Sequence, residues 1–328
     1  MTSDGSAFDF GIDSATRILI TGAGGFLGGP CCDLLSARGF DVHAVGRGDA
    51  EERQRNETRP GVRWWRADLR DPVAAASVVR GVRPTHLLHL AWATGADGFR
   101  DSPENYRWIG PGLEMLRAFA EVGGRRFVGV GTGAEYDWGG VTCVEGDTPL
   151  RPTLTYGLCK RAFFELFERF RGQTDLSGAW GRLFFLYGPG EEERRLVSSA
   201  IVSALRGEPA RCNYDRLRRD YLYVGDAAEG LVRLLLSDVQ GPVNLASGEA
   251  PSLGELVTAA AARAGRPDLV ELGGLPEVDH PAPTVVADVT RARRELGWGP
   301  TRTLDEGLDE TVAWWRTQLG EANGKEPS

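Results

Sequence analysis

A short apolar segment that runs directly into a cluster of glycines constrains the fold of this chain more than any other feature. Residues 17–21 are RILIT, the glycines follow within TGAGGFLG, and an apolar stretch covers 26–35. This order predicts a buried strand, a tight turn and a helix. The alternation continues, with strands expected at 41–45, 62–66, 86–91, 126–130 and 179–186 and helices at 72–80, 105–122 and 155–171. Strands that alternate with helices indicate an α/β fold whose parallel sheet carries helices on both faces.

The alternation weakens after Tyr187, where a smaller second part of the chain begins. We expect helices at 196–205, 227–236, 253–264 and 304–316, and short strands at 220–224 and 242–245 that return to the sheet. The predicted organisation is a nucleotide-binding domain at 17–186, to which 219–246 returns, and an interleaved substrate-binding domain at 187–218 and 247–318, with disordered tails at 1–16 and 319–328. In such folds ligands bind at the carboxyl ends of the strands, between the two parts.

Charge and composition exclude several classes of partner. The formal net charge is −8, from 38 basic and 46 acidic residues, which disfavours general binding to nucleic acid or to anionic membranes. No apolar run approaches the roughly 20 residues of a membrane-spanning helix, and the acidic, polar start does not resemble a signal peptide. The five cysteines are odd in number and lack CxxC spacing, which fits a reducing compartment. We therefore expect a soluble cytoplasmic protein.

The glycine cluster has the spacing GxxGxxG, formed by Gly22, Gly25 and Gly28. Glycines in a turn between a strand and a helix allow a positive φ and a close approach of phosphate to backbone N–H groups. The helix N-terminus would then face the pyrophosphate of a dinucleotide. The alternative is an ordinary glycine-rich loop, since the chain contains 44 glycines. The position of the cluster between the first strand and a helix favours dinucleotide binding.

The residues after the second and third strands bear on the choice of dinucleotide. An acidic residue after the second strand would favour NAD, whereas an arginine accommodates the 2′-phosphate of NADP. The sequence has Arg47 there, with no carboxylate before Asp49, so we expect NADP(H) to be preferred and NAD to be possible. A solvated loop arginine is the alternative. Asp68, after the third strand, is a candidate partner for the adenine amino group, or a helix cap, a role that Asp71 suits better.

Tyr156 and Lys160 lie four residues apart, on one face of a predicted helix. A nearby ammonium favours the phenolate form, which would bring the pKa of the tyrosine toward the range useful for proton transfer. An exposed helical pair is the alternative. However, the chain has only two lysines, and the other, Lys325, lies in the polar C-terminal tail. We therefore interpret the pair as functional. Thr132, at the end of a predicted strand, is a candidate for orienting a substrate oxygen, or a turn-forming threonine.

No metal site is expected. His86 and His89 are three residues apart on a predicted strand, so their side chains point to opposite faces, which is poor geometry for a shared metal ion. A histidine that is packed in the core or bonded to the backbone is the better interpretation of each.

Together these motifs resemble the extended short-chain dehydrogenase/reductases of the sugar-nucleotide epimerase/dehydratase/reductase family. The resemblance runs from residue 17 to residue 316 and includes, besides the glycine turn, Thr132 and the Tyr156/Lys160 pair, the motifs Asp68-Leu69, His89-Leu90-Ala91, Asn105, Arg182, Tyr187-Gly188-Pro189-Gly190, Arg219-Asp220-Tyr221 and Leu296-Gly297-Trp298. The stretches GTGAEYDW and AWGRLFFLYGPG are similar to bacterial NDP-4-ketohexose reductases of the CDP-abequose synthase-like kind.

The resemblance implies a Rossmann-type doubly wound parallel sheet, a homodimer formed through the helices that begin near Asn105 and Thr155, and a catalytic triad of Thr132, Tyr156 and Lys160. It implies a nicotinamide dinucleotide as cofactor and a nucleotide sugar or a related small molecule as substrate. The expected cofactor contacts are Gly22, Gly25, Phe26, Leu27, Gly28, Arg47, Asp68, Leu69, Leu90, Ala91, Tyr156 and Lys160. The expected substrate contacts are Trp92, Glu135, Phe185, Arg195 and Arg219, with Arg219 on the diphosphate and a structural role as the alternative for Glu135.

Departures from the family pattern reduce the number of reactions that this chain is expected to catalyse. Family dehydratases carry Asp-Glu after the triad threonine, whereas this chain has Gly133-Ala134, which argues against dehydration. Phe185 stands where many members have asparagine. A second diphosphate-binding arginine, expected near 277–287, is missing, and Arg195, Arg216 and Arg218 are candidate substitutes. The first hypothesis is an NADPH-dependent keto-sugar reductase, the second an epimerase that retains NAD(P), and the third a non-catalytic dinucleotide sensor.

Overall fold

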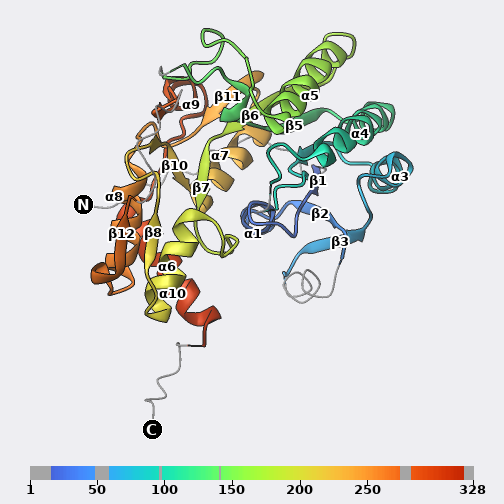
Figure 1. Ribbon diagram of the computed structural model, residues 1–328. Coiled ribbons are helices and arrows are strands. Elements are labelled where there is room, and N and C mark those ends of the chain that lie inside the picture. Colours follow the sequence, from blue (N-terminus) through green and yellow to red (C-terminus); the bar gives the residue numbers. More distant parts are fainter. Residues whose placement is uncertain (1–15, 49–58, 96–97, 140–141, 274–281, 321–328) are drawn as a thin grey trace, which may run out of the picture.

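The computed structural model describes residues 16–48, 59–95, 98–139, 142–273 and 282–320 (Figure 1). Its centre is a seven-stranded parallel sheet with the strand order β11-β6-β5-β4-β1-β2-β3. The strands are β1 (Arg17–Thr21), β2 (Asp41–Gly46), β3 (Val62–Arg66), β4 (His86–His89), β5 (Arg126–Thr132), β6 (Ser177–Leu183) and β11 (Gly241–Leu245). This arrangement confirms the predicted α/β class and the parallel sheet.

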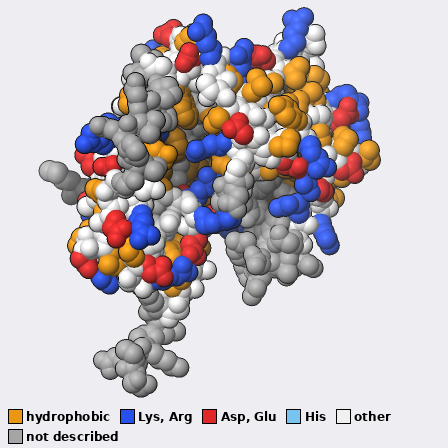
Figure 2. All heavy atoms as spheres, viewed as in Figure 1, with side chains coloured by type: hydrophobic (Ala, Val, Ile, Leu, Met, Phe, Trp, Pro, Cys, Tyr) orange, Lys and Arg blue, Asp and Glu red, His pale blue; other side chains and the backbone are white. Residues whose placement is uncertain are grey.

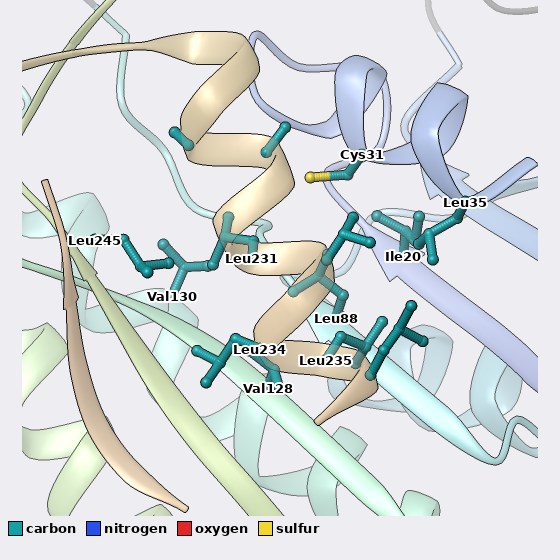
Figure 3. Packing of buried hydrophobic residues seen from close by; sticks show 14 of the residues in the cluster. Ile20, Cys31, Leu35, Leu88, Val128, Val130, Leu231, Leu234, Leu235 and Leu245 are labelled. Carbon is teal, nitrogen blue, oxygen red and sulfur yellow. The ribbon is translucent and has the colours of Figure 1, made fainter. Parts of the chain in front are cut away.

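Helices cover both faces of the sheet (Figure 1). The first face carries α3 (Pro72–Val82), α4 (Ile109–Glu121) and α5 (Thr155–Arg171), and the second carries α1 (Gly28–Ala37), α7 (Val224–Leu236) and α9 (Thr290–Leu296). On the second face, aliphatic side chains of α7 and α1 pack against residues of β1, β4, β5 and β11 (Figure 3). The side chains shown there include Ile20, Cys31, Leu35, Leu88, Val128, Val130, Leu231, Leu234, Leu235 and Leu245.

The chain reverses its direction of travel across the sheet between β1 and β4. From β1 the chain runs outward to β2 and β3, and it then returns to place β4 on the other side of β1. The loops that follow β1 and β4 therefore leave the sheet in opposite directions and open a crevice at their carboxyl ends. This is the position at which open α/β sheets bind ligands.

A second lobe packs beside the carboxyl edge of the sheet and has a hydrophobic core of its own (Figure 1). Its helices are α6 (Leu196–Arg206), α8 (Leu253–Arg263) and α10 (Leu304–Gln318), with a 3₁₀ turn η3 (Pro267–Leu269). Its strands form parallel pairs: β7 (Phe185–Tyr187) with β10 (Tyr221–Tyr223), β8 (Ala210–Cys212) with β12 (Val270–Leu272), and β9 (Arg218–Arg219) with β13 (Thr284–Val285). None of the helices in the described ranges is long and apolar enough to cross a membrane.

Several predicted elements differ from the structure. The helix expected at 105–122 is a 3₁₀ turn, η1 (Pro103–Trp108), followed by α4, because Pro111 has no N–H to donate to the carbonyl of Arg107. The strand expected at 220–224 does not return to the central sheet. It forms β10, which pairs with β7. β7 is separate from β6 because the chain leaves the sheet after Leu183. Only β11 joins the sheet as expected.

The expected tails also need correction at their inner ends. Thr16 is buried, and Leu319 packs against the core of the second lobe, so both belong to the folded body. The rest of the N-terminal segment and residues 321–328 lie outside the described residues. The five cysteines are all buried free thiols.

The glycine turn generates a prediction about stability. A Cβ atom on Gly28 would lie 2.2 Å from the carbonyl oxygen of Gly22 and 2.6 Å from Cα of Ala23, both of which are backbone atoms with little freedom to move. We expect Gly28→Ala to lower the free energy of unfolding by about 1–3 kcal/mol through overpacking. Urea denaturation measures the change. Gly110→Ala is the matched control, since its Cβ would meet nothing within 4 Å. Equal stability of Gly28→Ala and the wild type would contradict this packing.

Candidate active site

The glycine turn after β1 leaves room for a ligand and none for side chains. Gly22 has a φ of +66°, and a Cβ atom there would lie 2.9 Å from the backbone of Ala91. The N–H of Gly25 donates to the carbonyl of Gly22 at 3.1 Å, which tightens the turn. The N-terminus of α1 therefore begins directly at the crevice, with no acidic residue in its first turn. This arrangement fits the pyrophosphate of a dinucleotide, with Phe26 and Leu27 partly buried beside it.

Thr21 joins the ends of β1 and β4 across this crevice. Its hydroxyl accepts hydrogen bonds from the N–H groups of Leu90 and Ala91, each at 3.1 Å, and bonds to Nδ1 of His89 at 2.8 Å. The buried His89 has a pKa lowered to about 3 by its burial, so it stays neutral. His86 bonds to the Thr85 hydroxyl. Among the described residues no group of three or more His, Cys, Asp or Glu side chains could hold a metal ion.

The carboxyl ends of β2 and β3 place Arg47 and Asp68 near each other. Arg47 is exposed just beyond β2, and its charge contributes to lowering the pKa of Asp68. Hydrogen bonds from Arg70 are the main cause of this shift, which brings the pKa to about 2. Asp71 caps α3 by accepting from the N–H of Val73, so the cap belongs to Asp71, whereas Asp68 pairs with Arg70. Leu69, between them, is buried.

The structure brings Thr132, Tyr156 and Lys160 together at the carboxyl end of β5. Thr132 is the last residue of β5, and Tyr156 and Lys160 project from the first turns of α5. The Lys160 ammonium donates to the carbonyl of Val130 at 2.8 Å and lies 3.9 Å from the ring centroid of Trp92. It lies 6.0 Å from the ring centroid of Tyr156. Burial lowers the pKa of Lys160 to about 7.

The pKa of Tyr156 departs from the sequence-based expectation. Burial raises its pKa above the ordinary value, and the charge of Glu135 adds to the rise. A hydrogen bond with Thr132 and the charges of Arg195 and Arg100 act in the opposite direction. The expected lowering by Lys160 is wrong for this structure, because the loss of solvation outweighs the favourable charges. Tyr156 therefore holds its proton at neutral pH, as an ordinary tyrosine also does.

Glu135 supports the site from beneath. Its side chain is fully buried, and its carboxylate accepts from the Thr132 N–H at 2.9 Å, from Nε1 of Trp180 at 3.0 Å and from Nε of Arg182 at 2.8 Å. The Thr132 hydroxyl in turn accepts from the N–H of Ala134, which completes a capping box on the 3₁₀ turn η2 (Gly133–Glu135). Full burial and three protein donors favour the structural alternative for Glu135 over a substrate contact.

Trp92 borders the pair of Tyr156 and Lys160, as expected for a residue of the site. Its ring meets the Tyr156 ring edge-to-face, with centroids 6.5 Å apart, and stacks on Trp108. Its Nε1 donates to Oδ1 of Asn105 at 2.8 Å, and the buried Asn105 amide donates to the carbonyls of Phe99 and Ser102. This network holds the indole ring against the ammonium group.

Arg219 and Phe185 form another wall of the site. Arg219 is buried, and its guanidinium lies 6.0 Å from the ring centroids of both Phe185 and Trp138. It donates to the carbonyls of Arg218 and Pro283. Burial lowers its pKa, and no carboxylate in the described part of the chain forms an ion pair with it. A buried cation with only carbonyl partners fits the binding of an anion.

Of the candidate substitutes for the missing diphosphate arginine, only Arg195 borders this site. Its guanidinium lies 5.0 Å from the Phe99 ring centroid and donates to the carbonyl of Thr94. Arg216 and Arg218 line a separate hollow of about 680 Å³ that Ser252 and Glu255 also border. The reason is the alternation of side chains along a strand: Arg218 and Arg219 are neighbours in β9 and point to opposite faces.

The segment 98–102 is part of the site, although it carries none of the motifs found in the sequence. The Phe99 ring meets the Tyr156 ring edge-to-face at 5.2 Å, and the carbonyl of Arg100 accepts from the Tyr156 N–H at 2.7 Å. Asp101 accepts from the N–H of Thr155 at 3.2 Å. These residues satisfy donors at the first turn of α5. No local motif marks such a contact, because its partners are more than 50 residues apart in the chain.

The pKa of Lys160 generates a prediction about dinucleotide binding. An ammonium that holds the ribose hydroxyls must be protonated, so binding above the pKa requires proton uptake. We expect the affinity for NADPH to be constant below about pH 6 and to fall by up to about tenfold per pH unit above about pH 7. Fluorescence titration of NADPH across this range measures the dependence. Lys160→Met should bind more weakly and lose the dependence, whereas Lys325→Met, the matched control, should keep it. A wild-type affinity that does not change with pH would refute this role.

The chain is similar to known proteins along most of its length. Residues 18–246 match the NAD dependent epimerase/dehydratase family. The chain is 28% identical to UDP-glucuronic acid decarboxylase 1 of Xenopus tropicalis over 92% of its length and 73% of the relative. It is also 28% identical to GDP-mannose 3,5-epimerase 1 of Oryza sativa subsp. japonica over 92% of its length and 82% of the relative.

Solved structures agree with this assignment. The UDP-glucose 4-epimerase of Thermus thermophilus in complex with NAD superposes with a TM-score of 0.81 at 27% identity, covering 92% of this chain and 99% of that one. MoeE5 in complex with UDP-glucuronic acid and NAD gives a TM-score of 0.78 at 29% identity, covering 92% and 100%. The family match spans more than half of the chain. The protein therefore belongs to the NAD dependent epimerase/dehydratase family and is an enzyme of the extended short-chain dehydrogenase/reductase type.

Proposed function

We propose that the protein is an NADPH-dependent reductase of a nucleotide-activated keto-sugar, with the sugar C4 carbonyl as the reacting group. The observation that carries the proposal is the convergence of Thr132, a protonated Tyr156 and Lys160 beside the glycine turn. A bound nicotinamide dinucleotide supplies the hydride. Tyr156 donates its hydroxyl proton to the carbonyl oxygen, and Thr132 donates a hydrogen bond that orients the same oxygen. Lys160 holds the ribose hydroxyls of the dinucleotide.

The residues that follow Thr132 argue against dehydration. In a reductase Tyr156 acts as an acid, and a tyrosine is protonated at neutral pH. Elimination of water would need an acid and a base next to Thr132, but Gly133 and Ala134 carry neither. Moreover, a Cβ atom on Gly133 would lie 2.7 Å from the ring of Phe184, so the structure leaves no room for a side chain there.

Epimerisation with a retained cofactor is the second candidate. It is favoured by the structures that superpose on this chain, which include the UDP-glucose 4-epimerase of Thermus thermophilus in complex with NAD. In that reaction Tyr156 would first remove a hydroxyl proton from the sugar, and hydride would leave and return on the other face. That first step requires the phenolate form of Tyr156, which burial of the side chain disfavours.

The homodimer implied by the family resemblance is part of the proposal. Leu158 and Leu166 of α5 are 48% and 43% exposed, and Tyr106 of η1 is 55% exposed. Figure 2 shows hydrophobic side chains gathered over α5 and α4. Pairing of these helices with their copies in a second chain would remove this apolar surface from water.

Arg47 generates a prediction about cofactor choice. Its guanidinium is exposed just beyond β2 and suits the 2′-phosphate that distinguishes NADPH from NADH. We expect the wild type to bind NADPH more tightly, and Arg47→Ala to lose about ten- to a hundredfold of that preference. Titration with both cofactors measures the ratio, with Arg80→Ala on α3 as a control that keeps it. Equal wild-type affinity for NADH and NADPH would overturn the assignment.

The reaction type is tested by the fate of the cofactor. We expect the purified protein to release little dinucleotide on denaturation, as identified by mass. With a panel of nucleotide 4-keto-6-deoxysugars it should consume NADPH in proportion to product, and Tyr156→Phe should be about 10²- to 10⁴-fold slower. Stoichiometric NAD(P)⁺ in the purified protein, with interconversion of two nucleotide sugars and no loss of NADPH, would establish the epimerase instead. Full biological activity of Tyr156→Phe would point to a non-catalytic sensor.

A further inference from the structure

Two arginines from different lobes share one aromatic ring next to Tyr156. The Phe99 ring centroid lies 5.8 Å from the guanidinium of Arg100 and 5.0 Å from that of Arg195. Arg100 belongs to the segment before η1, whereas Arg195 is the N-cap residue of α6 in the second lobe. The same Phe99 ring contacts the Tyr156 ring at 5.2 Å. Both cations therefore border a ring that contacts Tyr156.

These two cations lack the carboxylate partners that many arginines of this protein have. Arg17 pairs with Asp41 and Arg80 with Glu121, for example. Within the described ranges, neither Arg100 nor Arg195 forms an ion pair with a carboxylate, and the only protein acceptor of the Arg195 side chain is the carbonyl of Thr94. Like charges held on one ring repel each other. Such a cluster is typical of a site that an anionic ligand completes.

A third cation, Arg219, faces the same space. Burial raises the pKa of Tyr221, and the charges of Arg100 and Arg219 both oppose that rise. Burial lowers the pKa of Arg219, and the charge of Arg100 acts in the same direction. Figure 2 shows basic side chains in the hollow between the two lobes. Glu191, whose pKa burial raises to about 7, is the carboxyl group that also faces Tyr221 and Arg195. Its hydrogen bond from Ser198 directs it toward α6.

We propose that Arg100 and Arg195 form a second anion-binding site, across the cleft from Arg219, that binds an oxyanion of the nucleotide-sugar substrate. This inference rests on the proposed function. The oxyanion is either the diphosphate or a carboxylate on the sugar, both of which match the planar fork of arginine. The site takes the place of the second diphosphate-binding arginine that the family pattern leads one to expect near 277–287.

Arg100 also connects substrate binding to the position of Tyr156. Its carbonyl accepts the Tyr156 N–H at 2.7 Å, and the neighbouring Asp101 accepts the Thr155 N–H. The buried Asn105 amide donates to the carbonyls of Phe99 and Ser102 and so fixes both ends of this turn. An anion bound by the Arg100 side chain therefore orders the same turn that supports the start of α5. Arg100 is thus a substrate-binding residue that also positions Tyr156.

Binding measurements test the site without reference to turnover. The NADP⁺-saturated protein is titrated with UDP, dTDP, CDP and GDP, and with the glucose and glucuronic acid conjugates of UDP. We expect Arg100→Gln and Arg195→Gln each to weaken binding about tenfold, and to reduce its salt dependence, because each removes one charge-assisted contact. Arg125→Gln, an exposed arginine at the opposite end of β5, is the matched control. The backbone carbonyl of residue 100 remains in Arg100→Gln, so the start of α5 keeps its hydrogen bond. Circular dichroism checks that each variant is folded.

The outcomes distinguish a diphosphate from a sugar carboxylate as the bound oxyanion. They also distinguish failure of the anion site from failure of the proposed function. Weaker binding of the free nucleoside diphosphates by both variants assigns the site to the diphosphate. Weaker binding of UDP-glucuronic acid alone assigns it to a sugar carboxylate. Unchanged binding of every probe by both variants overturns the anion site, whatever reaction the enzyme performs. If the wild type binds none of the probes, both the anion site and the proposed nucleotide-sugar substrate are overturned. A reductase that acts on another substrate would still be detected by its consumption of NADPH.

Discussion

The buried ion pair between Glu135 and Arg182 is the interaction on which the candidate active site depends. Both side chains are almost completely removed from water, which is costly for two charges unless every contact is well made. Here the carboxylate has three donors, and Arg182 also donates to the Tyr136 hydroxyl, which in turn donates to Asn244 on β11. The pair therefore ties β5, β6 and β11 together just below Thr132. Loss of one partner would leave an uncompensated charge in the interior, at a cost of about 3–5 kcal/mol.

Thr132, Tyr156 and Lys160 are each held in place by a different part of the fold. Thr132 is held through its backbone by Glu135, so its hydroxyl stays available at the end of β5. Tyr156 and Lys160 are held by α5, whose first turn rests on the carbonyl of Arg100 and whose lysine is fixed by Val130 and Trp92. Groups that act on one substrate atom must keep their separation, and supports from strand, helix and turn achieve this better than one flexible loop.

The parts of the fold that the sequence predicted are those with local causes. The glycine turn, the strands on either side of it and α5 follow from hydrophobic periodicity and from backbone requirements such as the positive φ of Gly22. Tyr156 and Lys160 could be identified because their spacing places them on one helix face. By contrast, the strand expected at 220–224 pairs with β7 instead of the central sheet, and local sequence does not encode the choice of partner.

Electrostatic surroundings were the least predictable part of the site. The sequence suggested that Lys160 would lower the pKa of Tyr156, but the pKa depends on burial, which arises from Trp92, Phe99 and other distant residues. Glu135 lies three residues from Thr132, and only the fold reveals that its carboxylate faces Arg182. Arg100 carries no motif at all. It joins the site because the turn at 98–102 packs on the start of α5.

The site contains one lysine and several arginines, and these residue types respond differently to alkaline solution. Only two lysines occur, so arginine supplies the other 36 of the 38 basic residues. Guanidinium groups keep their charge throughout the pH range in which proteins remain folded, whereas the Lys160 ammonium loses its proton near neutrality. Rising pH therefore removes the charge of Lys160 and leaves Arg100, Arg195 and Arg219 charged. Under the proposed roles, alkaline solution would weaken binding of the dinucleotide and spare the anion site.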